Sequence, residues 1–272
     1  MLIYSAVKLT VKRKTDGTPP LNLAIATGFF WSVNNTLYLI TNWHNVTAWD
    51  PIQNKCMSDT GAQPTHVEMP LLLKAGDSGG RPMVERRRFD IPLYTDHGKP
   101  TWMEHPVFGN KIDVVALELL TLKDNLVSLP INKIGDLVDF EPLIGDDVFV
   151  LGYPGGLDGG NELAIWKRGS LASQPQVDVD GLPKLLIDTA TRKGMSGAPV
   201  IARRSGIIVP RGVTPELGKI SGQEIIGQAK TFLGVYSGRV GDDPLGVQLG
   251  IVWKARVLDE IVNGRTQGTS PF

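Results

Sequence analysis

The sequence predicts an all-β fold, and three observations lead to that prediction. The 272 residues include 31 glycines and 19 prolines, which indicate many turns. Between the turns lie about a dozen short apolar segments with the alternation or β-branched content of strands. A convincing helical pattern occurs only at the C-terminus, over Lys254–Asn263. Many short strands with little helix are typical of β-barrels.

The first half of the chain shows the strand pattern in order. Tyr4–Val11 and Leu21–Val33 are predicted strands, and a turn at 15–20 separates them. Asn34-Asn35 predicts a tight hairpin turn, and the apolar run Leu37–Val46 then predicts a buried strand that ends at a histidine. Further strands in this half are predicted at Val67–Leu73, Val84–Leu93 and Ile112–Leu119.

The second half begins with a connecting loop over Ile131–Pro142 and continues with short strands. A long glycine-rich loop is predicted at Ser205–Gln228. In the C-terminal helix, Trp253, Val257, Leu258 and Ile261 share one face, and Gly264 is a candidate cap. The predicted strands are Asp147–Gly156, which runs into a tight turn, Ile165–Ser170, Leu185–Thr189, Pro199–Ala202, Lys230–Arg239 and Gly246–Trp253.

Composition argues against several classes of protein. Lys plus Arg and Asp plus Glu both number 28, and this zero net charge disfavours nucleic acid as a partner. Apolar runs fall short of the roughly 18 residues that a membrane span needs. The single cysteine, Cys56, permits no internal disulfide, and the N-terminus resembles a strand more than a signal peptide. A cytoplasmic location is therefore expected, with secretion without disulfides as the alternative.

One glycine-rich turn carries the strongest chemical signal. The segment Gly194–Pro199 reads Gly-x-Ser-Gly-x-Pro and leads into a strand. Flanking glycines allow Ser196 to sit on a tight turn, where consecutive backbone N–H groups can converge on a developing oxyanion. Taken alone, the motif is equally compatible with an ordinary glycine-rich loop.

Two further residues complete a constellation with Ser196. His44 ends an apolar strand, where a histidine is either a satisfied core residue or a base. Asp113 precedes a strand that is apolar at every position, so its half-buried carboxylate needs a partner, either a backbone N–H or an imidazole. A serine nucleophile needs a base, and the base needs an orienting acid. The four histidines show no metal-ligand spacing, so no metal site is predicted.

A second serine, Ser78, lies in a competing motif. Gly76–Pro82 has the letters of a serine-protease nucleophile segment. However, the charged run Glu85–Arg88 follows it, where a nucleophile segment would lead into a core strand. We therefore predict a hairpin turn between Val67–Leu73 and Val84–Leu93, with no catalytic role for Ser78.

Five segments stand in the order of a known family. The sequence resembles the chymotrypsin-fold (trypsin-like) serine peptidases, and is most similar to the disulfide-free bacterial glutamyl endopeptidases and HtrA-type proteases. The segments are Ala26–Phe29, Thr41–His44, Ile112–Leu117, Leu151–Gly155 and Gly194–Val200, and Gly234–Gly238 and Gly250–Trp253 extend the match toward the C-terminal helix. Each segment is weak evidence alone, but five in the right order are strong evidence.

The resemblance implies two antiparallel six-stranded β-barrels with the active site between them. Residues 1–130 would form the barrel that carries His44 and Asp113, and residues 131–272 the barrel that carries Ser196, followed by the C-terminal helix. The family pattern makes Ser196 the nucleophile, His44 the general base and acid, and Asp113 its orienter. The N–H groups of Gly194 and Ser196 would form the oxyanion hole.

The function implied is a serine endopeptidase that acts through an acyl-enzyme on a protein or peptide substrate, without a cofactor. A regulatory partner or fused domain is left open. The main alternative is a catalytically weak or inactive peptide-binding module on the same fold. An α/β-hydrolase esterase is excluded because that fold needs alternating helices and the order Ser, Asp, His.

The resemblance also implies a substrate pocket whose preference remains open. Ala190 stands where trypsin has an acid, so cleavage after Lys or Arg is not expected. The basic residues around the pocket favour an acidic side chain, but Tyr236 replaces the histidine of glutamyl endopeptidases, and a small or apolar side chain is the other alternative. Met195 replaces the aspartate used in zymogen activation, so that route is not expected. The predicted substrate-binding residues are Ala190, Thr191, Lys193, Tyr236, Ser237, Gly238 and Arg239, and Arg192 adds to the basic surroundings.

Overall fold

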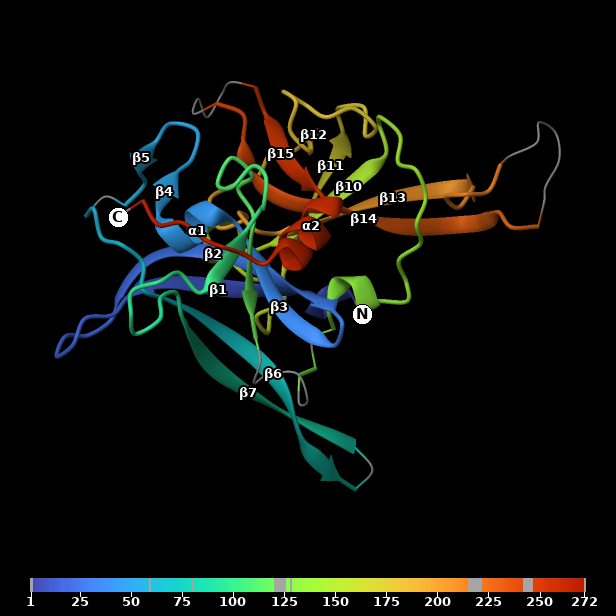
Figure 1. The fold of residues 1–272 in the computed structure, drawn as a ribbon. Coiled ribbons are helices and arrows are strands. Elements are labelled where there is room, and N and C mark those ends of the chain that lie inside the picture. Colours follow the sequence, from blue (N-terminus) through green and yellow to red (C-terminus); the bar gives the residue numbers. More distant parts are fainter. Residues whose placement is uncertain are drawn as a thin grey trace.

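The two halves of the chain form separate antiparallel sheets, which confirms the all-β fold (Figure 1). The computed structural model describes residues 2–58, 60–79, 81–119, 126–127, 129–214, 222–241 and 247–271, with side chains left undescribed at 77, 78, 81 and 82. The β2–β3 turn behaves as predicted, because Asn34 and Asn35 have φ angles of 48° and 62°, as a tight hairpin requires.

The first sheet takes its strands from the N-terminal half and one from the C-terminus. Among the described residues it has eight strands in the order β16-β8-β9-β3-β2-β1-β6-β7. It therefore differs from the expected six-stranded barrel, because it has two more strands, with the terminal strand β16 at one edge and the long β6–β7 hairpin at the other. Its strands are β1 (Ala6–Arg13), β2 (Leu21–Val33), β3 (Thr36–Thr41), β6 (His66–Ser78), β7 (Arg81–Pro92), β8 (Trp102–Glu104), β9 (Val115–Glu118) and β16 (Thr266–Gln267).

The second sheet is the closed barrel expected of the C-terminal half. Its strand order is β10-β11-β12-β15-β14-β13, with every neighbour antiparallel. The boundary at residue 130 remains a prediction. The barrel strands are β10 (Asp147–Gly152), β11 (Ile165–Leu171), β12 (Lys184–Asp188), β13 (Pro199–Ile208), β14 (Ile225–Arg239) and β15 (Leu249–Lys254).

Short elements connect the sheets and cover their ends. The helix α1 and the two-stranded hairpin β4–β5 follow β3 directly. The 3₁₀ turns lie at the N-terminus, before the barrel and after β10. These elements are α1 (Trp43–Thr47), β4 (Trp49–Asp50), β5 (Lys55–Cys56), η1 (Leu2–Tyr4), η2 (Ile131–Lys133), η3 (Pro154–Gly156) and the C-terminal helix α2 (Arg256–Gly264).

A shared core fixes the two sheets relative to each other. Phe29 and Trp31 of β2 each lie 5.6 Å, between ring centroids, from Phe232 of β14. The same buried cluster includes Val257 and Ile261 of α2, so the helix packs where the two sheets meet. Close packing of this kind resists relative movement, so residues from both halves can form one preorganised site.

Two hairpins project from the body of the molecule (Figure 1). One is β6–β7, which confirms the predicted hairpin and places Ser78 at the end of β6. The other is β13–β14, whose pairing continues to Ile208↔Ile225. The predicted loop at Ser205–Gln228 is thus wrong at both ends, because its β-branched isoleucines extend the ladder. Residues 215–221 of that loop lie outside the described residues.

The C-terminal helix is confirmed, but its cap is not Gly264. Val257, Leu258, Ile261 and Val262 form the buried face of α2, whereas Trp253 belongs to β15. The left-handed cap residue is Arg265, with φ 46°. Gly264 is instead required by packing, because a Cβ there would lie 2.7 Å from the Pro106 side chain.

Candidate active site

His44 lies in the first turn of α1, so the prediction of one continuous strand over Leu37–Val46 is wrong. The strand β3 ends at Thr41, and the chain turns into α1 after Asn42. The reason is packing: helical spacing places Trp43 and Val46 together in the core. His44 lies between them in sequence and faces the cleft between the two sheets.

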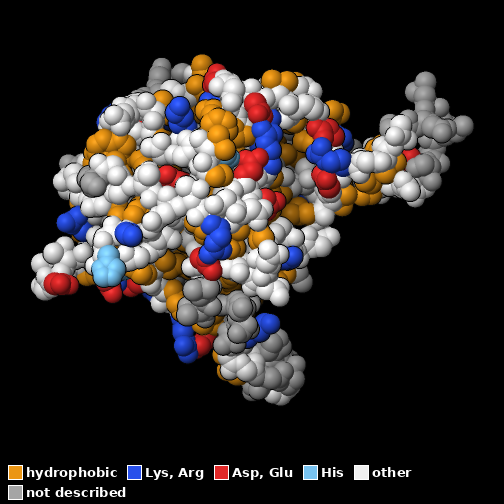
Figure 2. All heavy atoms as spheres, in the orientation of Figure 1, with side chains coloured by type: hydrophobic (Ala, Val, Ile, Leu, Met, Phe, Trp, Pro, Cys, Tyr) orange, Lys and Arg blue, Asp and Glu red, His pale blue; other side chains and the backbone are white. Residues whose placement is uncertain are grey.

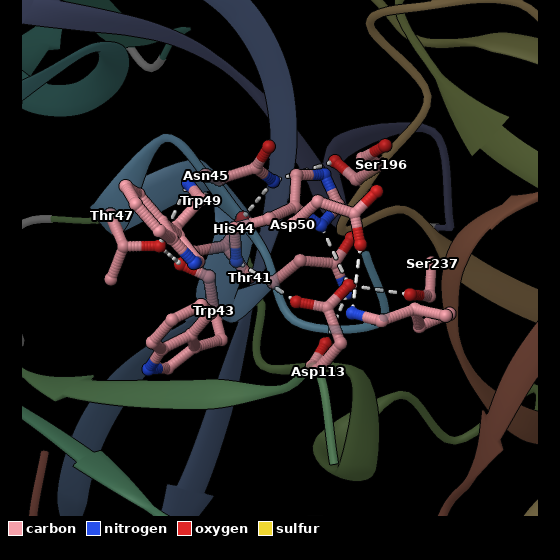
Figure 3. Close-up of polar contacts among 12 residues, drawn as sticks. Thr41, Trp43, His44, Asn45, Thr47, Trp49, Asp50, Asp113, Ser196 and Ser237 are labelled. Carbon is pink, nitrogen blue, oxygen red and sulfur yellow. Dashed lines mark hydrogen bonds and ion pairs between the residues drawn. The ribbon is translucent and has the colours of Figure 1, made fainter. Parts of the chain in front are cut away.

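Asp113 lies two residues before β9 and is bound to His44 at two points (Figure 3). Its Oδ1 accepts the backbone N–H of His44 at 2.9 Å, and its Oδ2 lies 2.6 Å from His44 Nδ1. The Ser237 hydroxyl also donates to Oδ2, at 2.5 Å. Both partners considered from the sequence, a backbone N–H and an imidazole, are therefore present.

This arrangement assigns the tautomer of the His44 ring. An ionised carboxylate only accepts hydrogen bonds, so the proton of the neutral imidazole belongs on Nδ1. The lone pair of Nε2 then remains available on the opposite side of the ring. An imidazole held in this way can take a proton from a hydroxyl.

The electrostatics of the site favour the protonated imidazole. Burial is the largest single influence and lowers the pKa of His44, but two carboxylates together outweigh it. Asp113 raises this pKa by its charge and its hydrogen bond, and Asp50 raises it by charge alone. The pKa of His44 therefore stands above its ordinary value of 6.5.

Ser196 lies on a turn that only glycines on either side permit. Gly194 and Gly197 have φ angles of 94° and 85°, in the left-handed region. A Cβ at Gly194 would lie 2.2 Å from the Tyr153 carbonyl oxygen, and one at Gly197 would lie 2.1 Å from that of Thr27. The turn is thus pressed against both sheets.

The backbone of the same turn presents two free N–H donors. The Lys193 carbonyl accepts the Gly155 N–H at 2.7 Å, so in a trans peptide the Gly194 N–H points the opposite way. Within the described part of the chain, the N–H groups of Gly194 and Ser196 donate to no carbonyl oxygen. Such a pair is the arrangement that an oxyanion hole requires.

A buried polar network ties this turn to the first sheet. The Thr27 hydroxyl donates to the Gly194 carbonyl at 2.7 Å, and the Thr27 N–H donates to the Ser196 carbonyl at 2.9 Å. The Asn45 side-chain amide bridges the Ser196 carbonyl and the Thr41 hydroxyl, at 3.2 and 2.9 Å. The turn that carries Ser196 is therefore positioned by residues around His44, from the other half of the chain.

One cleft of about 360 Å³ contains most of the predicted site residues. His44, Asp113 and Ser196 line it together, although they lie far apart in sequence. Gly194 lines an adjoining cleft that His44 and Ser196 share. Ala190 is exposed and is not among the lining residues. The predicted substrate-binding residues that do line the main cleft are Thr191, Lys193, Tyr236, Ser237, Gly238 and Arg239.

Ser196 and His44 approach each other without a hydrogen bond between their side chains. Among the described residues, no hydrogen bond joins the Ser196 hydroxyl to His44 Nε2. Catalytic hydrogen bonds are often long without substrate and tighten in the complex. Both side chains line the same cleft.

Two roles in the site were not foreseen from the sequence. Ser237, expected to bind substrate, donates to Asp113 from a position 124 residues away in the chain. Asp50 lies beside the His44 imidazole in Figure 3 and acts on it electrostatically. Neither residue carries a local motif, so no sequence signal identifies these roles.

Within the part of the chain that the structure describes, no group of three or more His, Cys, Asp or Glu side chains is placed to hold a metal ion. No helix among the described residues has both the length and the apolar character needed to cross a bilayer.

Asp50→Asn is expected to move the acid limb of the pH–rate profile to lower pH. If His44 is a general base it must be neutral to act, so the rate falls as the pH drops through its raised pKa. Removing the Asp50 charge lowers that pKa, and activity then persists to lower pH. The measurement is kcat/KM against pH, with Asp90→Asn, which pairs with Lys14 outside the cleft, as control. An unmoved limb, or one shifted upward, contradicts the assignment.

Comparisons with known proteins bear on the same residues. A family model of the trypsin-like peptidase domain matches residues 26–209, a span that includes His44, Asp113 and Ser196. Among solved structures, the active form of the Rv3671c protease from M. tuberculosis is 18% identical with a TM-score of 0.46, and the match covers 99% of this chain and 84% of that one. The HtrA-type protease AlgW with a tripeptide is 12% identical with a TM-score of 0.47, covering 96% and 60%. No curated protein matches the sequence.

Proposed function

Because the chain belongs to the family of trypsin-like peptidase domains, we propose that it is a serine endopeptidase in which Ser196, His44 and Asp113 act together. The observation that carries the proposal is the double contact of Asp113 with His44, in a cleft that Ser196 also lines. This arrangement orients the imidazole toward the place where a serine nucleophile would need its base.

The proposed reaction has two halves. His44 Nε2 takes the Ser196 proton as Oγ attacks the peptide carbonyl, and Asp113 stabilises the imidazolium that forms. The N–H groups of Gly194 and Ser196 donate hydrogen bonds to the oxyanion. His44 then gives its proton to the leaving amine, which departs and leaves an ester on Ser196. Water, deprotonated by His44, hydrolyses this acyl-enzyme and restores the free serine.

A protein or peptide is the substrate that the family and the site favour. Positive and negative side chains lie interspersed on the face in Figure 2, without a broad area of one sign. That distribution, together with the zero net charge, supports the expectation that nucleic acid is not the partner. The expected cytoplasmic location rests on the single cysteine and remains a prediction.

The test is to look for the acyl-enzyme in the wild-type protein. An activated ester should give a burst of leaving group equal to the enzyme concentration, followed by slower steady turnover. Intact mass spectrometry of the quenched burst should show one added acyl group. A peptide-binding module on the same fold would bind peptides with neither burst nor adduct, and this result would favour the alternative.

A further inference from the structure

The floor of the cleft contains a buried pair of hydroxyls. Tyr236 lies on β14 next to Ser237, and Thr191 lies on the loop that leads to Ser196. The two hydroxyls form a hydrogen bond with each other, and both residues are almost completely buried. The Tyr236 ring is held against the backbone of β15, since a Cβ at Gly250 would lie 2.7 Å from its Cε2.

This pair retains one unused donor. Two hydroxyls carry two hydrogens, and one hydrogen is consumed in the bond between them. Within the described part of the chain, neither hydroxyl has a second acceptor. Burial, which the Thr191 hydrogen bond and the Arg239 charge only partly offset, raises the pKa of Tyr236 to about 12, so the phenol keeps its proton at neutral pH. The remaining hydrogen is therefore available to an acceptor on a ligand.

A cation lines the same cleft as this donor. Arg239 lines the same cleft three residues after Tyr236, and its positive charge acts on the phenol. No carboxylate of the described residues forms an ion pair with Arg239, whereas Lys184 of the same cleft is already paired with Asp180. Lys193 adds a second exposed cation at the rim.

The carboxylates of the cleft are engaged elsewhere. Asp113 is occupied by His44 and Ser237. Asp50 lies beside His44, and its Oδ1 accepts the N–H groups of Ile52 and Gln53. Neither acid pairs with Arg239, so the described groups leave an uncompensated positive charge near the hydroxyl pair.

We infer that Thr191, Tyr236 and Arg239 form a subsite for an acidic side chain, Glu or Asp, on the residue just before the scissile bond. This inference rests on the proposed function and adds the substrate class. A carboxylate would accept the free O–H hydrogen and pair with the guanidinium. An apolar side chain would bury the O–H hydrogen and the guanidinium without a hydrogen bond to the first or an ion pair with the second. A basic side chain would be repelled by the like charge of Arg239.

The first experiment compares peptides that differ only at that residue. Glu and Gln have nearly the same shape, so their ratio of kcat/KM isolates the effect of charge. A charge-assisted contact predicts that Glu exceeds Gln by about 10- to 100-fold, and that Leu and Lys are poorer still. Equal cleavage after Glu and Gln, or faster cleavage after Leu, overturns the subsite.

Variants then assign the preference to residues. Arg239→Gln should reduce the Glu-to-Gln ratio to within about threefold of unity, because the charge is gone while a polar side chain remains. Tyr236→Phe should weaken cleavage after Glu while retaining the ring that packs on Gly250. Arg87→Gln, on the β6–β7 hairpin outside the cleft, should keep the wild-type ratio. A ratio unaffected by Arg239→Gln would remove Arg239 from the subsite.

A binding measurement separates this inference from the proposed function. In Ser196→Ala, calorimetry with product-like peptides ending in Glu or Gln requires no turnover. Tighter binding of the Glu peptide supports the subsite even if the wild type cleaves nothing, an outcome that would overturn the peptidase proposal alone. Equal affinities overturn the subsite even in an active peptidase.

Discussion

Ser196→Ala should lower kcat for peptide hydrolysis by about a million-fold, the loss typical of a serine peptidase without its nucleophile. The substitution removes the oxygen that forms the acyl-enzyme and leaves a methyl group on the same turn. The backbone contacts of the turn with Thr27 are unaffected, so the variant should fold as the wild type does. Activity is measured with a peptide substrate, and labelling with a fluorophosphonate probe should disappear.

The matched control is Ser78→Ala, in the competing motif. Ser78 ends β6 in the projecting β6–β7 hairpin, whose described residues do not line the cleft around His44. This variant should keep both labelling and turnover. If the two alanine variants lose labelling equally, or Ser78→Ala alone loses it, the assignment of Ser196 fails.

His44→Ala should reduce kcat about as much as Ser196→Ala, again by roughly a million-fold, because the hydroxyl loses its base. Combining the two substitutions should cost little more than either alone, since the residues act as one unit. The exposed His97, which lies in a turn, provides the control, and His97→Ala should retain wild-type kinetics. An additive double variant would mean that the two residues act independently. A His44→Ala protein that keeps a substantial rate would mean that the base is misassigned.

Much of the fold could be predicted because its signals are local. The strand Leu21–Val33 was predicted with the bounds of β2, since its apolar run ends at an asparagine pair suited only to a turn. The glycines around Ser196 were equally informative, because each occupies a backbone conformation or a space that excludes a side chain. Such features depend on a few adjacent residues, which a sequence displays directly.

The predicted fold is wrong where contacts between distant residues, and not local sequence signals, determine the structure. After Thr41 the apolar residues are Trp43 and Val46, and so short a pattern does not distinguish a strand from a short helix. The packing of Trp43 and Val46 in the core favours the helix. The extension of β13 and β14 depends on pairing between Ile208 and Ile225 across a long connection, which glycine content masked.

The candidate site likewise combines residues that the sequence identifies with contacts that only the folded structure shows. Its three central residues were identified by type, order and neighbouring motif, and their roles remain proposals to be tested. The contact of Ser237 with Asp113 joins β14 to the segment before β9, and the influence of Asp50 comes from a separate short hairpin. Contacts between distant segments leave no periodicity or spacing in the sequence, so the fold had to be known first.

The most direct test of the account is a crystal structure of the protein inhibited by a peptidyl phosphonate. We expect a covalent bond from phosphorus to Ser196 Oγ, with a phosphonyl oxygen bound by the N–H groups of Gly194 and Ser196, and with His44 Nε2 in contact with the adduct. A phosphonate attached to another residue, or an imidazole that stays out of contact with the modified serine, would contradict it.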